Sequence, residues 1–354
     1  MTLVTLIVSD SWKRLKDGAA RLMARLYARR GSGAAVAADQ RSAEQELDLA
    51  RTAGDPHTRQ GLRIRLERIL EELLVPTAFA DRALRKERLR MAPLSGRLRE
   101  AADPFAAVGG PQPLDWLEAQ RSAVLEVLRA VVRHKLYILY TPAWYLAEAY
   151  AVVLLYRRRT ESWQRELLEL GIEAAEEAAA RARTAGELTE AMAGEARLRS
   201  LLSRLLVDLG QYDGAREQLQ KANARAEASG DLELRASVLE FFGRYLDIVD
   251  PPAAIEMYRR SLELNERAGQ TRGIALVTFY LGCALGRQGD RRGAMVLLHR
   301  ALEELEHRVE PDLRMAARVR VAIGLIHRDL GETEDAIIQL LAAVAALRAV
   351  ADDM

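Results

Sequence analysis

An internal repeat in the C-terminal part of the chain constrains the fold more than any other feature. Four segments align, "LGQYDGAREQL" (209–219), "VDPPAAIEMY" (249–258), "QGDRRGAMVLL" (288–298) and "LGETEDAIIQL" (330–340). The alanines they share are Ala215, Ala254, Ala294 and Ala336, so the period is 39, 40 and then 42 residues. A small residue recurs eleven or twelve positions before each alanine, as Ser203, Gly243, Gly282 and Gly324. A period of this length is typical of a solenoid, in which each unit packs on its neighbours.

Each repeat is predicted to be a hairpin of two antiparallel helices. Gly210, Gly289 and Gly331 stand where the first helix of a hairpin should end, and glycine takes the left-handed conformation that closes a helix. Two helices approach closely only where small side chains meet, so we predict that the four small residues and the four alanines are packing anchors. The glycines of 281–302 therefore indicate a hairpin turn, and the G-x-x-x-x-G-K-[ST] string of a phosphate-binding loop does not occur in the chain.

The segment "LLVDLGQYDGAREQLQKA" (205–222) resembles the tetratricopeptide repeat (TPR) family, although the copies here exceed its usual length of about thirty-four residues. The joints "ASGD" (228–231) and "RAGQTRG" (267–273) resemble those of the C-terminal arrays of actinobacterial STAND regulators, whose central part is an NB-ARC-type nucleotide switch. The resemblance covers about residues 78–354 and implies an all-α fold, a right-handed superhelical array of TPR-like hairpins. Because the phosphate-binding loop is missing, the resemblance carries over partner binding, and no nucleotide is expected.

Three regions are predicted. Residues 1–77 form an N-terminal helical region of two or three helices, with a helix from Asp55-Pro56 to about Val75. Residues 78–135 form a helical joining segment with a loop near 91–112, and residues 136–354 form about five hairpins, the first degenerate. Within the first region one apolar stripe has helical spacing, Trp12, Leu15, Ala19, Leu22 and Leu26. This basic helix fits either a small bundle or an anionic membrane surface.

The apolar stretch 136–156 carries Glu148 as its single charge and is the one candidate for a membrane span. Thr141-Pro142 reads as a helix start, which leaves a helix shorter than the roughly 20 residues that a bilayer requires. A buried helix is therefore favoured. Cys283 is the single cysteine, and the start of the chain lacks a convincing export signal, so a cytoplasmic protein is expected.

Composition and motifs argue against catalysis. The chain has 354 residues, of which 49% are hydrophobic and 29% charged, and its net charge is +1. The five histidines show no metal-ligand spacing, Cys283 fits a small packing residue, and the carboxylates alternate with arginines as on solvated helix faces. We therefore expect no enzyme activity, no catalytic residues, no cofactor and no metal.

The first helices of stacked hairpins line the concave face of such an array. By the resemblance, the residue after each small anchor points into this groove, which places an arginine there in two repeats. Further arginines lie one turn after this position in two repeats and two turns before it in two. The complete stripe comprises Arg197, Arg204, Arg244, Arg287, Arg318 and Arg328. Guanidinium groups match carboxylates and phosphates bidentately, so this groove is predicted to bind an acidic protein or peptide partner. Glu240 and Asp247 interrupt the stripe.

A non-catalytic interaction scaffold in bacterial signalling or regulation is the leading functional interpretation. One alternative is a nucleic-acid-linked transcriptional regulator that uses the basic segment 82–100, which contains Arg82, Arg85, Lys86, Arg88, Arg90, Arg97 and Arg99. Another is a membrane-associated adaptor that uses residues 1–30 or 136–156. The nearly neutral net charge makes nucleic acid the less favoured partner.

Overall fold

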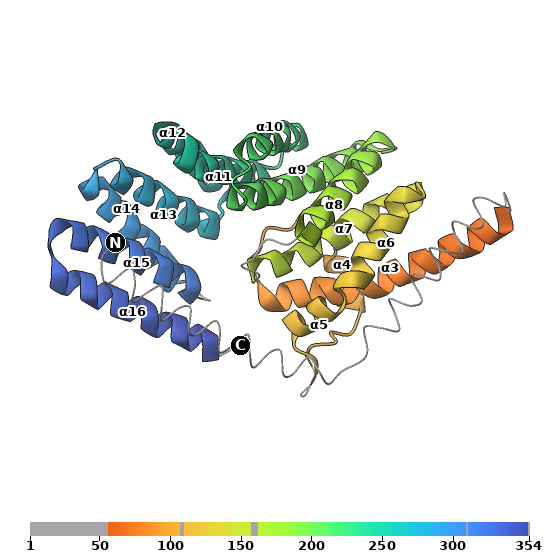
Figure 1. Cartoon of the computed structure of the whole chain (residues 1–354), viewed down its shortest axis with the longest axis horizontal. Helices are drawn as coiled ribbons and strands as arrows, with labels where there is room; N and C mark the ends of the chain where they lie inside the picture. The colour runs from red at the N-terminus through yellow and green to blue at the C-terminus, as the bar shows by residue number, and fades with distance from the viewer. Residues whose placement is uncertain (1–55, 107–109, 157–161, 309–310, 353–354) are drawn as a thin grey trace.

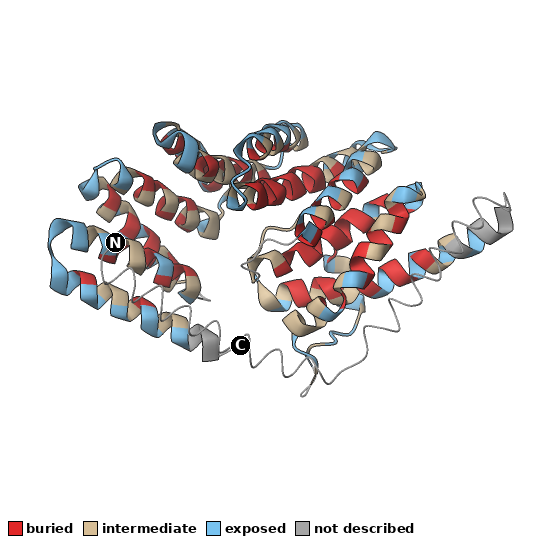
Figure 2. Ribbon diagram, in the orientation of Figure 1, coloured by how far each residue is buried: buried red, intermediate tan, exposed pale blue. Residues whose placement is uncertain are grey.

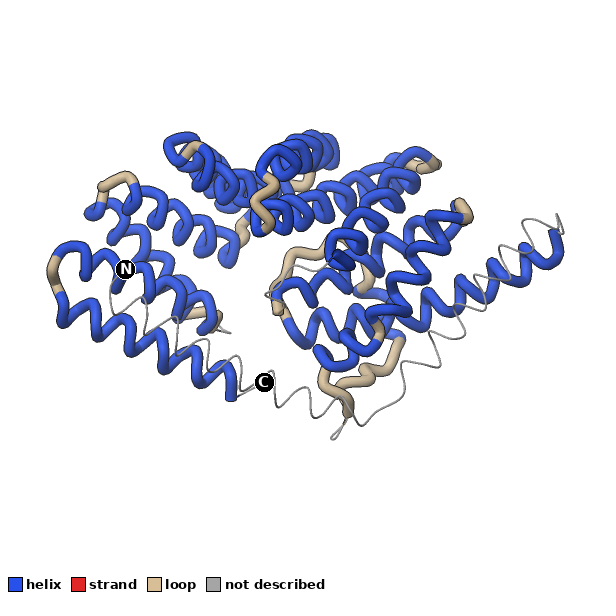
Figure 3. Tube along the Cα trace, viewed as in Figure 1, coloured by secondary structure: helices blue, strands red, loops and turns tan. Residues whose placement is uncertain are grey.

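The computed structural model describes residues 56–106, 110–156, 162–308 and 311–352. Helices connected by short loops make up these ranges, and no strand occurs within them (Figure 3). The fold is an all-α array, as predicted. The helices expected within residues 1–55, including the basic first helix, lie outside the described residues.

The described chain begins with a long helix, α3 (Pro56–Leu84), followed by α4 (Ser95–Glu100), α5 (Pro113–Ala119) and α6 (Arg121–Arg133). Helix α3 extends nine residues beyond the end expected at Val75 and crosses the predicted boundary at residue 77. Its second half contains Pro76 and buries Ala78 and Ala80, and α3 packs on α7. This packing stabilises the helix beyond a residue that usually ends one.

The apolar stretch 137–155 forms a short 3₁₀ turn (Tyr137–Leu139), helix α7 (Tyr140–Tyr150) and a second 3₁₀ turn (Ala151–Leu155). Within the described residues it is the one segment long and apolar enough to cross a membrane, but 72% of it is buried inside the fold. Trp144 and Tyr150 are fully buried there, and the Tyr150 hydroxyl donates a hydrogen bond to the carbonyl oxygen of Leu117 at 2.7 Å. The stretch is part of the main hydrophobic core.

Nine further helices follow in antiparallel succession and bend into an arc (Figure 1). They are α8 (Ser162–Ala180), α9 (Ala185–Asp208), α10 (Tyr212–Ser229), α11 (Leu232–Val249), α12 (Pro251–Ala268), α13 (Thr271–Arg287), α14 (Arg291–Glu306), α15 (Leu313–Leu330) and α16 (Thr333–Asp352). Helices α7 and α8 form the first, irregular hairpin, and four regular hairpins, α9–α10 to α15–α16, follow.

Short polar caps and left-handed glycines mark the ends of the helices. The side chains of Asp231, Asp250, Asp290 and Asp312 accept hydrogen bonds from the backbone N–H three residues on, which caps α11, α12, α14 and α15. The turn glycines Gly210, Gly289 and Gly331 have φ of +71°, +93° and +82°. These values explain why glycine punctuates the repeat.

The eight small anchors lie where the two helices of a hairpin meet. Ala215, Ala254 and Ala294 are fully buried, and Ala336 is 5% exposed. A Cβ added at Gly243 would lie 2.5 Å from the Tyr258 ring, whereas at Gly282 and Gly324 it would lie 3.1 Å from Leu298 and Leu340. The small residues thus admit a large side chain of the facing helix. The buried residues lie where neighbouring helices pack against one another, and the outer turns are exposed (Figure 2).

Candidate binding groove

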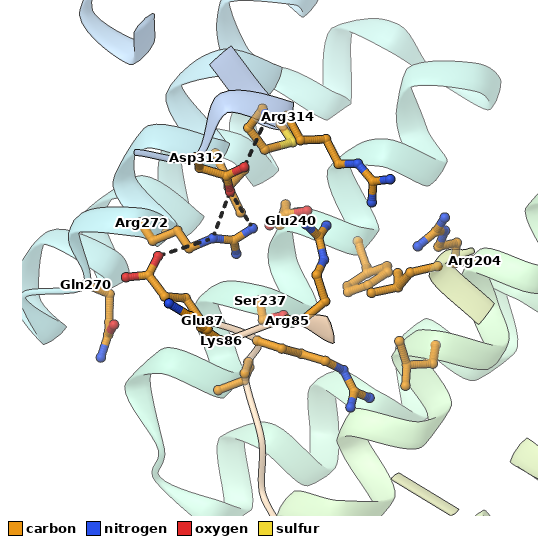
Figure 4. A pocket seen from close by; sticks show the side chains of 18 of the residues that line it. Arg85, Lys86, Glu87, Arg204, Ser237, Glu240, Gln270, Arg272, Asp312 and Arg314 are labelled. Carbon is orange, nitrogen blue, oxygen red and sulfur yellow. Dashed lines mark hydrogen bonds and ion pairs between the residues drawn. The ribbon is translucent and has the colours of Figure 1, made fainter. Parts of the chain in front are cut away.

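The concave side of the arc holds a cavity of about 1020 Å³, which we call the groove. Helices α9, α11, α13 and α15 supply most of its walls. The end of α3 with residues 85–89 (Figure 4), the stretch from Ala151 to Tyr156, and the loops before α13 and α15 supply most of the rest. The groove is therefore built both by the repeats and by the irregular N-terminal part of the molecule.

The repeats present side chains to the groove in one register. Positions are counted here from the small anchor of each repeat, which is Ser203, Gly243, Gly282 or Gly324. Six positions before the anchor, the groove is lined by Arg197, Ser237, Leu276 and Arg318. Those two positions earlier are Leu201, Phe241 and Tyr280, and those one position later are Arg204 and Arg244. Such spacing places these positions on one face of a helix. The same helix face therefore lines the groove in successive hairpins.

Four of the six arginines predicted for the groove line it: Arg197, Arg204, Arg244 and Arg318. We call them the arginine floor. Arg287 and Arg328 do not line it. Arg287 is the last residue of α13 and forms an ion pair with Asp247 at 2.5 Å, and Arg328 pairs with the neighbouring Asp329 at 2.7 Å. Both stand near the ends of their helices, where the chain turns away from the concave face.

Aromatic rings lie between the arginines of the floor, and the sequence interpretation did not include them. The Arg197 and Arg244 guanidinium groups lie 6.0 and 5.3 Å from the ring centre of Phe241. Arg244 also lies 5.2 Å from the Tyr280 ring, and Arg318 lies 5.5 Å from the Phe279 ring. Cation–π contacts of this kind orient guanidinium groups without neutralising them. The sequence does carry a signal for these rings, because an aromatic residue, Phe241 or Tyr280, stands two positions before Gly243 and Gly282.

Two members of the floor are cations in a dry environment. Arg197 is 6% exposed, and burial, followed by the nearby Arg88, lowers its pKa to about 10. Its Nη1 donates to Ser237 Oγ at 3.4 Å, and its buried Nε has no hydrogen-bond partner within the described part of the chain. Burial, followed by Arg244, also lowers the pKa of Arg204. Because burial disfavours the charged form of both residues, an incoming carboxylate would offset part of that cost.

Residues 85–92, which we call the strap, cross beside the floor and are fixed to the N-terminal helices. Arg88 and Arg90 form ion pairs with the buried Asp81 at 2.9 and 2.5 Å. The backbone N–H groups of Met91 and Ala92 each donate to a carboxylate oxygen of Glu148 at 2.8 Å. Glu148, the lone charge of the apolar stretch, therefore holds the strap.

The basic segment 82–100 is largely used inside the molecule. Besides Arg88 and Arg90, Arg97 pairs with Glu71 at 2.5 Å, and Arg82 donates to Ser95 Oγ at 2.8 Å. Arg85 lines the groove, and burial lowers its pKa. The buried pairs of Arg88 and Arg90 with Asp81 reduce the electrostatic support for a nucleic-acid site on this segment, whereas the contacts of Arg82 and Arg97 are exposed.

Glu87 of the strap joins the two ends of the arc. Its carboxylate lies 2.5 Å from Arg308. It also lies 3.7 Å from Arg272, which pairs with Asp312 at 3.1 Å (Figure 4). The guanidinium of Arg314 lies 5.3 Å from the ring centre of Tyr156 at the same junction. We call the contacts of Glu87 the latch, because they connect the N-terminal part to the last two hairpins.

The groove as a whole is basic. Ten arginine and lysine side chains line it against five aspartates and glutamates. The acidic residues Glu87 and Asp312 are engaged at the latch, and Glu240 lies 3.6 Å from Arg244. The net positive lining attracts anions, and the cavity walls concentrate that field.

One group of side chains has a spacing that a metal ion could bridge. Ligand atoms of His327, Glu332 and Asp335 lie within 4.8 Å of one another where α15 meets α16. Glu332 and Asp335 are exposed, and the His327 ring nitrogen is hydrogen-bonded to Glu332 at 2.6 Å. Exposed acidic groups of this kind are common without an ion, so we assign no metal here.

Comparison with known proteins supports the fold. No family model matches the chain, and no curated protein matches it. The solved structure of BtubC (BKLC) from P. vanneervenii is similar, with 20% identity and a TM-score of 0.51, and the match covers 67% of this chain and 92% of BtubC. The structure of MamA is matched with 16% identity and a TM-score of 0.36 over 55% of this chain and 99% of MamA. Together with the repeat and its anchors, the likeness to BtubC supports a TPR-like helical repeat fold.

Proposed function

We propose that this protein is a non-catalytic interaction scaffold whose groove binds an acidic segment of a protein partner. The observation that carries the proposal is the arginine floor, in which four guanidinium groups lie on one concave surface with aromatic rings between them. Carboxylates of a peptide can pair bidentately with guanidinium groups, and its apolar side chains can contact Phe241 and Tyr280. The volume of about 1020 Å³ exceeds most small-ligand pockets and suits several residues of an extended chain.

The resemblance of the joints to STAND regulators suggests the setting. A cytoplasmic role in bacterial signalling or regulation agrees with the single cysteine, and the missing phosphate-binding loop favours a partner-binding role without nucleotide hydrolysis. We do not favour a membrane role for 136–156, because most of that stretch is buried in the core. A nucleic-acid role has little support, because Arg88, Arg90 and Arg97 form internal ion pairs.

A binding titration tests the proposal. Fluorescence anisotropy compares labelled peptides of six glutamates, six glutamines and six lysines, and a single-stranded DNA of similar length, on the full chain. We expect hexaglutamate alone to bind among the peptides. Because the floor supplies the counter-charges, Arg204→Gln/Arg244→Gln should weaken binding by at least about tenfold, the equivalent of about 1.4 kcal/mol.

The chain offers a matched control in the two predicted arginines that lie outside the groove. Arg287→Gln/Arg328→Gln removes the same net charge and should leave hexaglutamate affinity within about twofold, since exposed charges act weakly at a distance. If both double variants lost the same hexaglutamate affinity, the effect would be one of net charge alone, and the groove would be rejected as the binding site. Tighter binding of DNA than of hexaglutamate would favour the nucleic-acid alternative. Capture of lysate proteins by the wild type and by the Arg204/Arg244 variant then identifies the partner.

A further inference from the structure

The outer face of the last helix, α16, is apolar and exposed. Its exposed hydrophobic side chains are Ile337, Ile338, Leu341 and Val344, with exposures of 51%, 60%, 64% and 44%. On the opposite side, Ala336 and Ala343 are buried, and α16 packs there on α15. In a stacked array each hairpin covers an apolar face of its neighbour. Helix α16 is the last helix of the described array and lies at the edge of the arc (Figure 1), with its outer apolar face exposed.

This face is self-complementary. Consider a second copy related to the first by a 180° rotation about an axis through Leu341. The two α16 helices then lie antiparallel, and each residue faces the one equally far from Leu341 in the other direction along the chain. Leu341 then meets Leu341, Ile338 meets Val344, and Glu334 meets Arg348, all of them exposed. A two-fold interface requires the same patch on both copies to match itself, and this patch does so in both apolar contacts and charge.

We propose that α16 is the contact surface of a homodimer, formed by antiparallel packing of two copies about Leu341. The apolar residues form the centre of the contact and two Glu334–Arg348 pairs lie at its ends. A single helix-to-helix contact buries less than the ~1,600 Å² of a standard interface, so the dimer is concentration-dependent. Because no residue of α16 lines the groove, the two grooves stay open in the dimer and a bivalent partner can engage both.

Charge reversal tests the register with full-length protein in sedimentation velocity. Glu334→Arg and Arg348→Glu each place like charges opposite each other and should shift the wild-type dimer towards the monomer. The double variant Glu334→Arg/Arg348→Glu restores opposite charges and should dimerise again. An equimolar mixture of the two single variants should also dimerise, because every pair in the mixed dimer is then attractive. Circular dichroism checks that helix content is unchanged.

Crosslinking tests the axis itself. In a Cys283→Ser background, Leu341→Cys should form a disulfide-linked dimer under mild oxidation, because the two residues meet on the axis. Val296→Cys is the matched control, since Val296 on α14 is also 64% exposed and should not crosslink. The proposal is overturned if the wild type sediments as a monomer at every concentration, which is the outcome expected if another part of the same chain covers α16. A dimer unaffected by both charge reversals overturns it too. These outcomes are independent of hexaglutamate binding in the groove.

Discussion

The N-terminal half of the molecule and its last three hairpins are held together in different ways. The largest cluster of buried residues runs from α3 into α10, reaches Tyr245 of α11, and includes Trp144, Tyr150 and Leu167. A smaller cluster joins α9, α10 and α11. From α11 onwards they form smaller clusters, each shared by two or three consecutive helices. In the first region most helices depend on one core, whereas in the second each hairpin depends on its nearest neighbours.

The difference implies different roles for the two regions. A quasi-one-dimensional stack unfolds in parts and bends easily, because each interface is local. The continuous core gives a rigid base, from which the strap and the latch extend to the last hairpins. The groove therefore has one rigid wall and one compliant wall, which suits adjustment to a peptide.

Removal of Trp144 should produce the largest effect. Trp144 is fully buried, and its ring lies where a Cβ on Gly194 would come within 2.6 Å. Trp144→Ala leaves a large cavity in the continuous core and should lower the free energy of unfolding by about 3–5 kcal/mol in urea titrations. Val296→Ala, at an exposed position, should stay within about 0.5 kcal/mol. A Trp144→Ala loss below that of a single hairpin anchor would contradict the division into two regions.

Glu148 tests whether the strap is part of the rigid base. Glu148 is 1% exposed and accepts the backbone N–H groups of Met91 and Ala92. Glu148→Gln loses a charge-assisted pair, so we expect a destabilisation of about 1.5–3 kcal/mol. Trypsin should then cleave the strap at Arg85–Arg90 faster than in the wild type. The exposed Glu263→Gln serves as a control, and unchanged cleavage would show that the strap is held by other contacts.

The anchor glycines test the local character of the C-terminal hairpins. Gly243→Ala forces a Cβ to 2.5 Å from the Tyr258 ring and should cost about 1–3 kcal/mol. Hydrogen exchange should rise in α11 and α12 and remain unchanged in α7. Gly61→Ala is the matched control, because no atom lies within 4 Å of its added Cβ, and it should stabilise α3 by about 0.5–1 kcal/mol. Increased exchange across all helices would show one cooperative unit.

The period of the repeat was sufficient to predict the hairpins, because small residues facing each other at fixed spacing leave few alternatives. The groove was predicted only in part. Arg197, Arg204, Arg244 and Arg318 lie at helix positions that recur in the same register, so their placement followed from the repeat. Arg287 and Arg328 followed the same rule but stand at helix ends, where extrapolation by whole turns no longer describes the concave face.

The irregular contacts had no local signal in the sequence. The partners Glu87 and Arg308 are 221 residues apart, and Glu148 and Met91 are 57 apart. Neither pair belongs to the repeat, so no spacing rule connects its members. Helix α3 passes Pro76 for a similar reason, since tertiary packing on α7 stabilises a helix that local preference would end.

The latch should give the smallest effect on stability and the clearest effect on binding. Glu87 is 43% exposed, so Glu87→Gln should change the free energy of unfolding by less than about 1 kcal/mol. It frees Arg308 for an incoming carboxylate, while Arg272 keeps its pair with Asp312, and hexaglutamate should bind several-fold more tightly, with a steeper salt dependence. Asp329→Gln, which frees Arg328 outside the groove, is the matched control and should leave binding unchanged. If Glu87→Gln instead bound hexaglutamate more weakly, the latch would shape the groove and would not compete with its ligand. The compliant wall would then depend on the latch for its alignment.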